Sequence, residues 1–117
     1  MRVPPNVVSA LLVASASLSI APSALASRED VVYLTAAGFT PAWITLSVGD
    51  RVRFTVRDHK VHQIAKTSGP NSGDVEPNVL SRQGDSVTLM PDEPGTYMYV
   101  DRLNPHKPEL RVTVRGR

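Results

Sequence analysis

The 117-residue sequence contains no cysteine. This absence excludes disulfides, thiolate nucleophiles, thiolate metal ligands and a lipoprotein anchor. Aromatic residues make up only 5% of the sequence, and the basic residues are dispersed rather than gathered in runs. A dispersed charge pattern does not indicate a nucleic acid or a membrane surface as the partner. A small exported chain without disulfides would have to be stabilised by packing alone.

The first 26 residues have the pattern of an export signal. Arg2 is followed by an apolar stretch with small residues at 7–20, and Ala24-Leu25-Ala26 has the small-x-small form of a cleavage site. The apolar run of about 15 residues is shorter than the roughly 20 that a transmembrane helix requires. We therefore predict a signal peptide at 1–26 and a periplasmic or secreted domain at 27–117, without membrane insertion after cleavage. The alternative is an uncleaved membrane anchor.

The predicted mature chain is small and nearly neutral. It has 91 residues (117 − 26), and loss of Arg2 leaves 12 basic residues (13 − 1) against 11 acidic ones, a net charge of +1. This length is enough for one domain with a modest core. We expect a monomer that binds no nucleic acid.

The mature chain shows the period of two that is typical of β-strands and no helical pattern. Val52, Phe54 and Val56, for example, alternate with polar residues. Gly49-Asp50 lies between two such runs, where a tight turn favours positive φ. Seven strands are expected, with an eighth possible, at 31–35, 44–48, 51–57, 61–65, 86–90, 96–100 and 110–114. Short strands with frequent turn residues predict an all-β antiparallel sandwich or small barrel, with one long loop at 66–79.

Three polar residues near predicted strand ends form a possible metal site. His62 begins the fourth of these strands, and Asp101 and His106 lie in the loop between the last two. Two imidazoles and a carboxylate suit Cu(II) or Zn(II). Alternatively, Asp101 caps the backbone of its own loop, as aspartate often does in turns. His59 is expected to be a solvated turn residue.

Three motifs together resemble the cupredoxin family, to which plastocyanin, amicyanin and azurin belong. Residues 39–54 (FTPAWITLSVGDRVRF) are similar to the family's F-x-P-x-x-I-x-V-x-x-G-D-x-V-x-F opening. Asp58 and His62 match the N/D-x-x-x-H stretch whose histidine is the first copper ligand, and residues 94–99 (PGTYMY) resemble the strand before the second ligand. The resemblance covers about residues 39–114. It implies a Greek-key β-sandwich of about seven to eight strands.

The resemblance also implies that the copper ligand set is changed. Asp101 stands where the family has cysteine, His106 matches the next histidine, and the methionine position falls near Glu109 or Leu110. Blue-copper electron transfer depends on a Cu–thiolate bond, so the sequence excludes it. We expect a non-blue, type-2-like Cu(II) site made by His62, Asp101 and His106, with Glu109 or water completing it, in a protein that captures or carries copper.

The alternative function is a metal-free cupredoxin-fold interaction module associated with an envelope metal-uptake system. Under either interpretation an envelope metal-transport protein is a possible partner. No enzymatic activity is expected, because copper enzymes of this superfamily generally combine several domains and more histidines. Tyr97 and Tyr99 are expected in the core, with one hydroxyl bonded to backbone. Trp43 is expected to pack at a sheet edge; the alternative is an exposed contact residue.

Overall fold

The computed structural model describes residues 27–117, which form nine strands and no helix. The predicted signal peptide, residues 1–26, lies outside the described residues. No helix in the described part is long and apolar enough to cross a membrane. The strands are β1 (Glu29–Thr35), β2 (Gly38–Thr40), β3 (Trp43–Ser47), β4 (Arg51–Val56), β5 (His62–Ser68), β6 (Val79–Leu80), β7 (Ser86–Leu89), β8 (Gly95–Asp101) and β9 (Leu110–Arg115).

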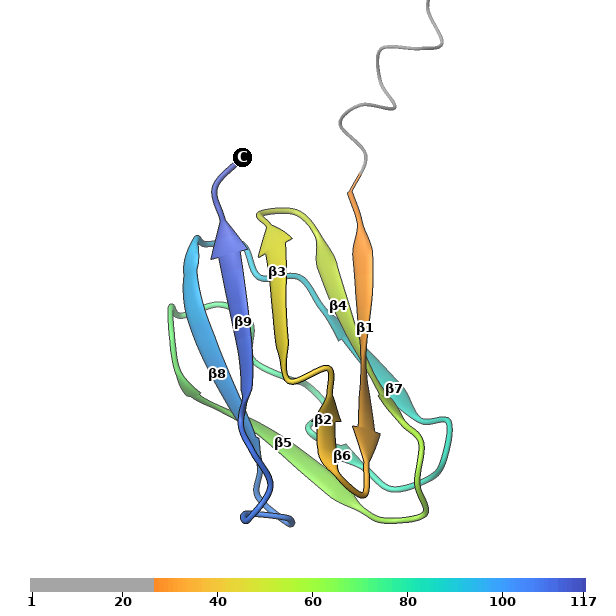
Figure 1. The fold of residues 1–117 in the computed structure, drawn as a ribbon. Coiled ribbons are helices and arrows are strands. Elements are labelled where there is room, and N and C mark those ends of the chain that lie inside the picture. Colours follow the sequence, from red (N-terminus) through yellow and green to blue (C-terminus); the bar gives the residue numbers. More distant parts are fainter. Residues whose placement is uncertain (1–26) are drawn as a thin grey trace, which may run out of the picture.

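The strands form two sheets that face each other as a sandwich (Figure 1). One has the order β2-β1-β4-β7 and the other the order β3-β9-β8-β5-β6. The all-β sandwich is confirmed. The expectation of purely antiparallel sheets is wrong, because β1 pairs with β4 and β3 pairs with β9 in parallel. The two extra strands, β2 and β6, have three and two residues and lie in segments interpreted as turn or loop.

The Gly49 turn connects the two sheets rather than the two strands of one hairpin. Gly49 has φ +97°, as the sequence predicted. It joins β3, in the five-stranded sheet, to β4, in the other. The chain therefore changes sheets at this turn, and β4 returns beside β1 in the same direction.

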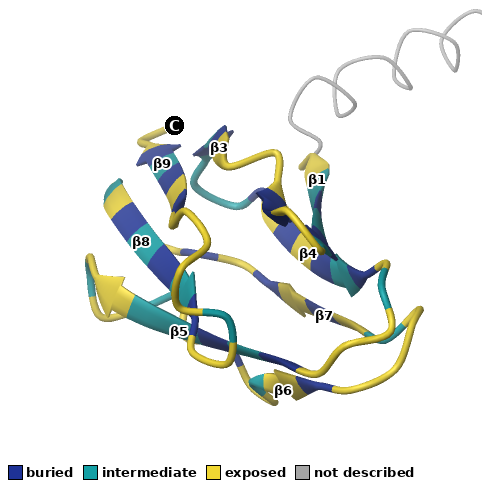
Figure 2. Cartoon of the chain, turned by 60° about the horizontal axis from the view of Figure 1, so that its bottom comes forward, coloured by how far each residue is buried: buried dark blue, intermediate teal, exposed yellow. Residues whose placement is uncertain are grey.

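Alternating burial places one face of each sheet in a shared core (Figure 2). Tyr97 and Tyr99 are fully buried there, as predicted. The Tyr97 hydroxyl donates to the Glu93 carbonyl at 2.6 Å, and the Tyr99 hydroxyl donates to the Gly73 carbonyl at 2.5 Å. Both hydroxyls are therefore bonded to backbone, where one was expected. Burial raises the pKa of Tyr99 far above its ordinary value, so the phenol stays a donor.

The long loop after β5 is held by one lysine. The Lys66 ammonium donates to the Ser72 carbonyl at 2.8 Å and to the Pro70 carbonyl, and it pairs with Asp74 at 3.1 Å. An ammonium with three oxygen partners orders a loop that has little regular structure of its own.

One buried carboxylate joins both ends of the described chain. Asp50 Oδ1 accepts the Arg28 backbone N–H at 2.9 Å and the Arg117 guanidinium at 2.7 Å, while Oδ2 accepts the Ser47 N–H at 2.9 Å. Backbone hydrogen bonds from Ser47 and Arg28 hold the pKa of Asp50 below its usual range. The start of the domain and its C-terminus consequently lie at the same end of the sandwich (Figure 1).

Candidate metal centre

His62 and Asp101 meet inside the sandwich, at the end opposite the C-terminus (Figure 1). His62 begins β5 and Asp101 ends β8, and these strands are antiparallel neighbours with Asp101 opposite Ile64. His62 is 2% exposed and Asp101 is 7% exposed. The distance from His62 Nδ1 to Asp101 Oδ2 is 2.6 Å. Two of the three predicted ligands are thus in direct contact.

Asp58 is a third member of this group that the sequence analysis did not assign to the site. Its Oδ1 lies 2.7 Å from His62 Nε2 and also accepts the Lys60 backbone N–H at 3.2 Å. The second oxygen, Oδ2, is buried and has no hydrogen-bond partner. The D-x-x-x-H spacing was the available signal: the intervening turn folds the chain back so that Asp58 faces the ring four residues later.

The three side chains form a buried ion cluster that favours a charged imidazole. Burial alone would lower the pKa of His62, but hydrogen bonds to Asp58 and Asp101 outweigh burial and raise it. Burial alone would likewise raise the pKa of both carboxyls. The hydrogen bonds that they accept, from His62 first and then from neighbouring N–H groups, together outweigh burial and lower both pKa values. The imidazolium therefore donates from both ring nitrogens, one to each carboxylate.

Asp101 also organises the turn that follows β8. Its Oδ1 accepts the backbone N–H groups of Gln63 at 3.0 Å and Leu103 at 3.1 Å. Its Oδ2 accepts the Asn104 amide at 2.8 Å in addition to the His62 ring. The capping role considered from the sequence is present, together with the contact to His62.

The remaining predicted ligands are not gathered around this pair. His106 and Glu109 are exposed, and the Glu109 carboxylate accepts the Thr67 hydroxyl at 3.4 Å. His59 is exposed in its turn, as expected. Within residues 27–117 no group of three or more His, Asp or Glu side chains is arranged to hold a metal ion.

The side chains at the centre have the chemistry to bind a borderline divalent cation. Imidazole nitrogen and carboxylate oxygen are ligands of Cu(II) and Zn(II), and they disfavour Cu(I), which prefers sulfur. In the contact between His62 Nδ1 and Asp101 Oδ2, a proton lies between two atoms that could each bind a metal ion. A metal ion binds such donors by displacing protons.

Comparisons with known proteins agree with the fold. A family model described as "Cupredoxin-like domain" matches residues 8–114. Solved structures that are similar include a mutant amicyanin in its reduced state, 22% identical with TM-score 0.61, covering 74% of this chain and 82% of the amicyanin chain. Plastocyanin from Dryopteris crassirhizoma is 24% identical with TM-score 0.59, over 73% and 99% of the two chains. A purple cupredoxin from Nitrosopumilus maritimus is 22% identical with TM-score 0.57, over 73% and 98%. No curated protein sequence matches the chain.

Proposed function

Because this chain belongs to the family of cupredoxin-like domains, whose members generally bind copper, we propose that it binds Cu(II) at a non-blue site and captures or carries the ion. The observation that supports this proposal is the buried contact between His62 Nδ1 and Asp101 Oδ2 at 2.6 Å. The proposed third ligand is His106, in the turn that Asp101 caps. Copper bound by this hard donor set supplies a Lewis-acidic cation held in the divalent state.

Asp58 has the position of a residue that orients a metal-binding histidine. Ligating histidines commonly donate their second ring N–H to a carboxylate, which fixes the tautomer and the ring orientation. The Asp58 carboxylate accepts from Nε2 of His62. This bond leaves Nδ1 as the donor atom that faces Asp101.

The proposed site makes metal binding compete with protonation. Because its two carboxylate partners raise the pKa of His62, the proton on Nδ1 is held more firmly than on a free imidazole. Copper affinity is then expected to increase about tenfold per pH unit while His62 is protonated, as one proton is released for each ion bound.

The wider role follows from the same proposal. The absence of a thiolate removes the ligand on which blue-copper electron transfer depends, so the proposed role is to hold copper and not to pass electrons. We place the protein in the periplasm or outside the cell, as a monomer without enzymatic activity, delivering copper to or receiving it from an envelope metal-transport protein.

A second candidate function is a metal-free interaction module. It is favoured by the hydrogen bonding of Asp101, whose two oxygens together accept four donors. In this alternative the imidazolium between two carboxylates replaces the metal cation as the positive centre of the site.

A copper titration separates the two candidates. The purified protein is titrated with Cu(II) by calorimetry and examined by electron paramagnetic resonance. We expect one tightly bound ion, a spectrum without the small hyperfine splitting of blue sites, and no intense thiolate charge-transfer band. Replacing His106 with alanine should weaken binding at least tenfold, about 1.4 kcal/mol.

His59→Ala is the matched control, because His59 is an exposed histidine outside the predicted ligand set. It should bind copper like the wild type. If the wild-type protein binds no Cu(II), the copper proposal is wrong and the metal-free module is favoured. If His62→Ala and His106→Ala bind Cu(II) as tightly as His59→Ala, the proposed site is wrong.

A further inference from the structure

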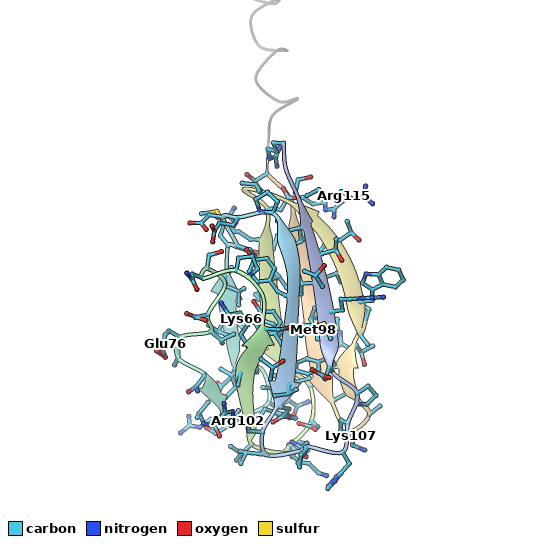
Figure 3. All side chains as sticks on the ribbon, turned by 90° about the vertical axis from the view of Figure 1, so that its left-hand side faces the viewer. Lys66, Glu76, Met98, Arg102, Lys107 and Arg115 are labelled. Carbon is cyan, nitrogen blue, oxygen red and sulfur yellow. The ribbon has the colours of Figure 1, made fainter. Side chains whose placement is uncertain are left out.

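The outer face of the five-stranded sheet carries a row of three large side chains, one on each of three neighbouring strands. Trp43 on β3 and Met98 on β8 are both in register with Arg111 on β9, which lies between them. Figure 3 looks onto this face, with Met98 near its centre. Trp, Met and Arg are enriched in protein–protein interfaces, and Trp and Arg are frequent hot spots.

Trp43 lies on the edge strand β3, and its side chain is exposed on this face, which is the alternative considered from the sequence. It is 61% exposed, and the Arg111 guanidinium carbon lies 4.4 Å from its ring centroid. This cation–π contact restrains two side chains that a partner would otherwise have to immobilise. The pair is therefore a pre-organised anchor.

The charge of the face favours an anionic partner. Its outward strand positions include Arg111 and Arg115, and neither forms an ion pair with another residue of the 27–117 segment. No strand residue on this face is acidic: the others are Trp43, Thr45, Ser47, Gln63, Ala65, Thr67, Ser68, Val79, Thr96, Met98, Val100 and Thr113. Glu109 lies at the margin, bonded to Thr67.

Part of the free edge of β3 is occupied by other groups of the same chain, which disfavours strand addition there. Ala42 and Val48, both even-numbered, form backbone hydrogen bonds with β9. Because backbone groups alternate between the two sides of a strand, the odd-numbered residues of β3 direct theirs to the free edge. There the Thr45 carbonyl accepts the Arg28 guanidinium at 2.7 Å, and the Ser47 N–H donates to Asp50.

The size of the face limits the partner to a short segment. Its four longer strands, β3, β9, β8 and β5, are about 4.8 Å apart and about 17 Å long, which gives a flat area of roughly 250–330 Å². A standard protein interface covers about 800 Å² on each partner. We propose that the row Trp43–Arg111–Met98 anchors a docking surface for a short acidic peptide segment of a partner protein. This surface does not depend on whether copper binds.

A peptide selection tests the proposal. Random short peptides displayed on phage are selected on the purified protein. Enriched sequences are synthesised and titrated by calorimetry, which also measures binding in a variant that lacks Trp43, the only tryptophan in the chain. We expect enriched peptides to carry at least two carboxylates and to bind more weakly as salt increases. Trp43→Ala and Arg111→Ala should each weaken binding by about tenfold or more.

Two control variants remove one exposed apolar side chain and one exposed arginine from other parts of the surface. Met90→Ala removes an exposed apolar side chain that follows β7, and Arg82→Ala removes an exposed arginine before β7. Both should bind the peptides like the wild type. Enrichment of neutral or basic peptides, equal loss in the control variants, or no enrichment at all would overturn the proposal. The proposal is also overturned if no peptide binds, while an acidic polysaccharide or anionic lipid vesicles bind the wild type and bind Trp43→Ala and Arg111→Ala more weakly.

Discussion

Replacing Asp101 with asparagine should destabilise the protein strongly, because it removes one carboxylate from a buried ion cluster. Removing one partner of a buried ion pair costs about 3–5 kcal/mol. The amide retains one oxygen for the N–H groups of Gln63 and Leu103. Its NH₂ group, however, faces the Asn104 amide, which is also a donor.

We expect the lower end of that range, about 3 kcal/mol, since His62 can release a proton and accept the new amide N–H at Nδ1. For a domain of this size each kcal/mol lowers the melting temperature by roughly 4–8 °C, so the total decrease is roughly 12–24 °C. Urea unfolding at pH 5.5, followed by circular dichroism, measures the free energy directly.

Asp92→Asn provides the reference for this measurement. Asp92 is exposed, and its replacement should change the free energy of unfolding by no more than about 0.5 kcal/mol. A loss of less than about 1 kcal/mol for Asp101→Asn would show that the His62–Asp101 contact does not support the fold, and the reasoning about the buried cluster would fail.

The two remaining predictions concern pH and a crowded glycine. The pKa of His62 is raised above 6.5 in the folded protein, so the stability that His62 contributes should be fully present below pH 6.5 and lost as pH rises through the folded pKa. The pKa values of Asp58 and Asp101 are lowered below 3.8, so the stability that these carboxylates contribute should be present above pH 3.8 and lost on further acidification. Urea midpoints from pH 3 to 9 should therefore form a plateau between these limits, and midpoints that rise above pH 7 would contradict this sign. Gly73→Ala should destabilise more than Gly84→Ala although both residues have positive φ, because an added Cβ would lie 2.8 Å from the Tyr99 hydroxyl at Gly73 and meets nothing within 4 Å at Gly84. Equal melting temperatures of the two variants would refute the packing argument.

Strand positions could be predicted from the sequence because burial follows the period of two. Val52, Phe54 and Val56 are all buried, as their alternation indicates. Strand partners could not be predicted in this way, because alternation fixes which side faces the core but not which strand lies alongside. The parallel β1–β4 and β3–β9 pairs result from changes of sheet that a local pattern does not contain.

The sequence could predict which residues of the candidate site meet only where those residues lie on strands. His62 begins β5 and Asp101 ends β8, and these adjacent antiparallel strands bring the two residues together. His106 lies in a turn whose path depends on the capping bonds of Asp101, and sequence spacing does not determine that path. Asp58 belongs to the same D-x-x-x-H motif, but its contact with the His62 ring depends on how the intervening turn folds, which the spacing alone does not determine.

Arg28 and Arg117, at the two ends of the described segment, both bond to Asp50, and this determines from which end of the domain attached segments would leave. A segment attached at either end would leave from the same end of the sandwich, with His62 and Asp101 at the far end. Strands about 20 Å long would separate the attachment point from the candidate site. A tethered copy would therefore expose its site outward, and the domain could also be inserted into a loop of another protein with little change in the spacing of that loop.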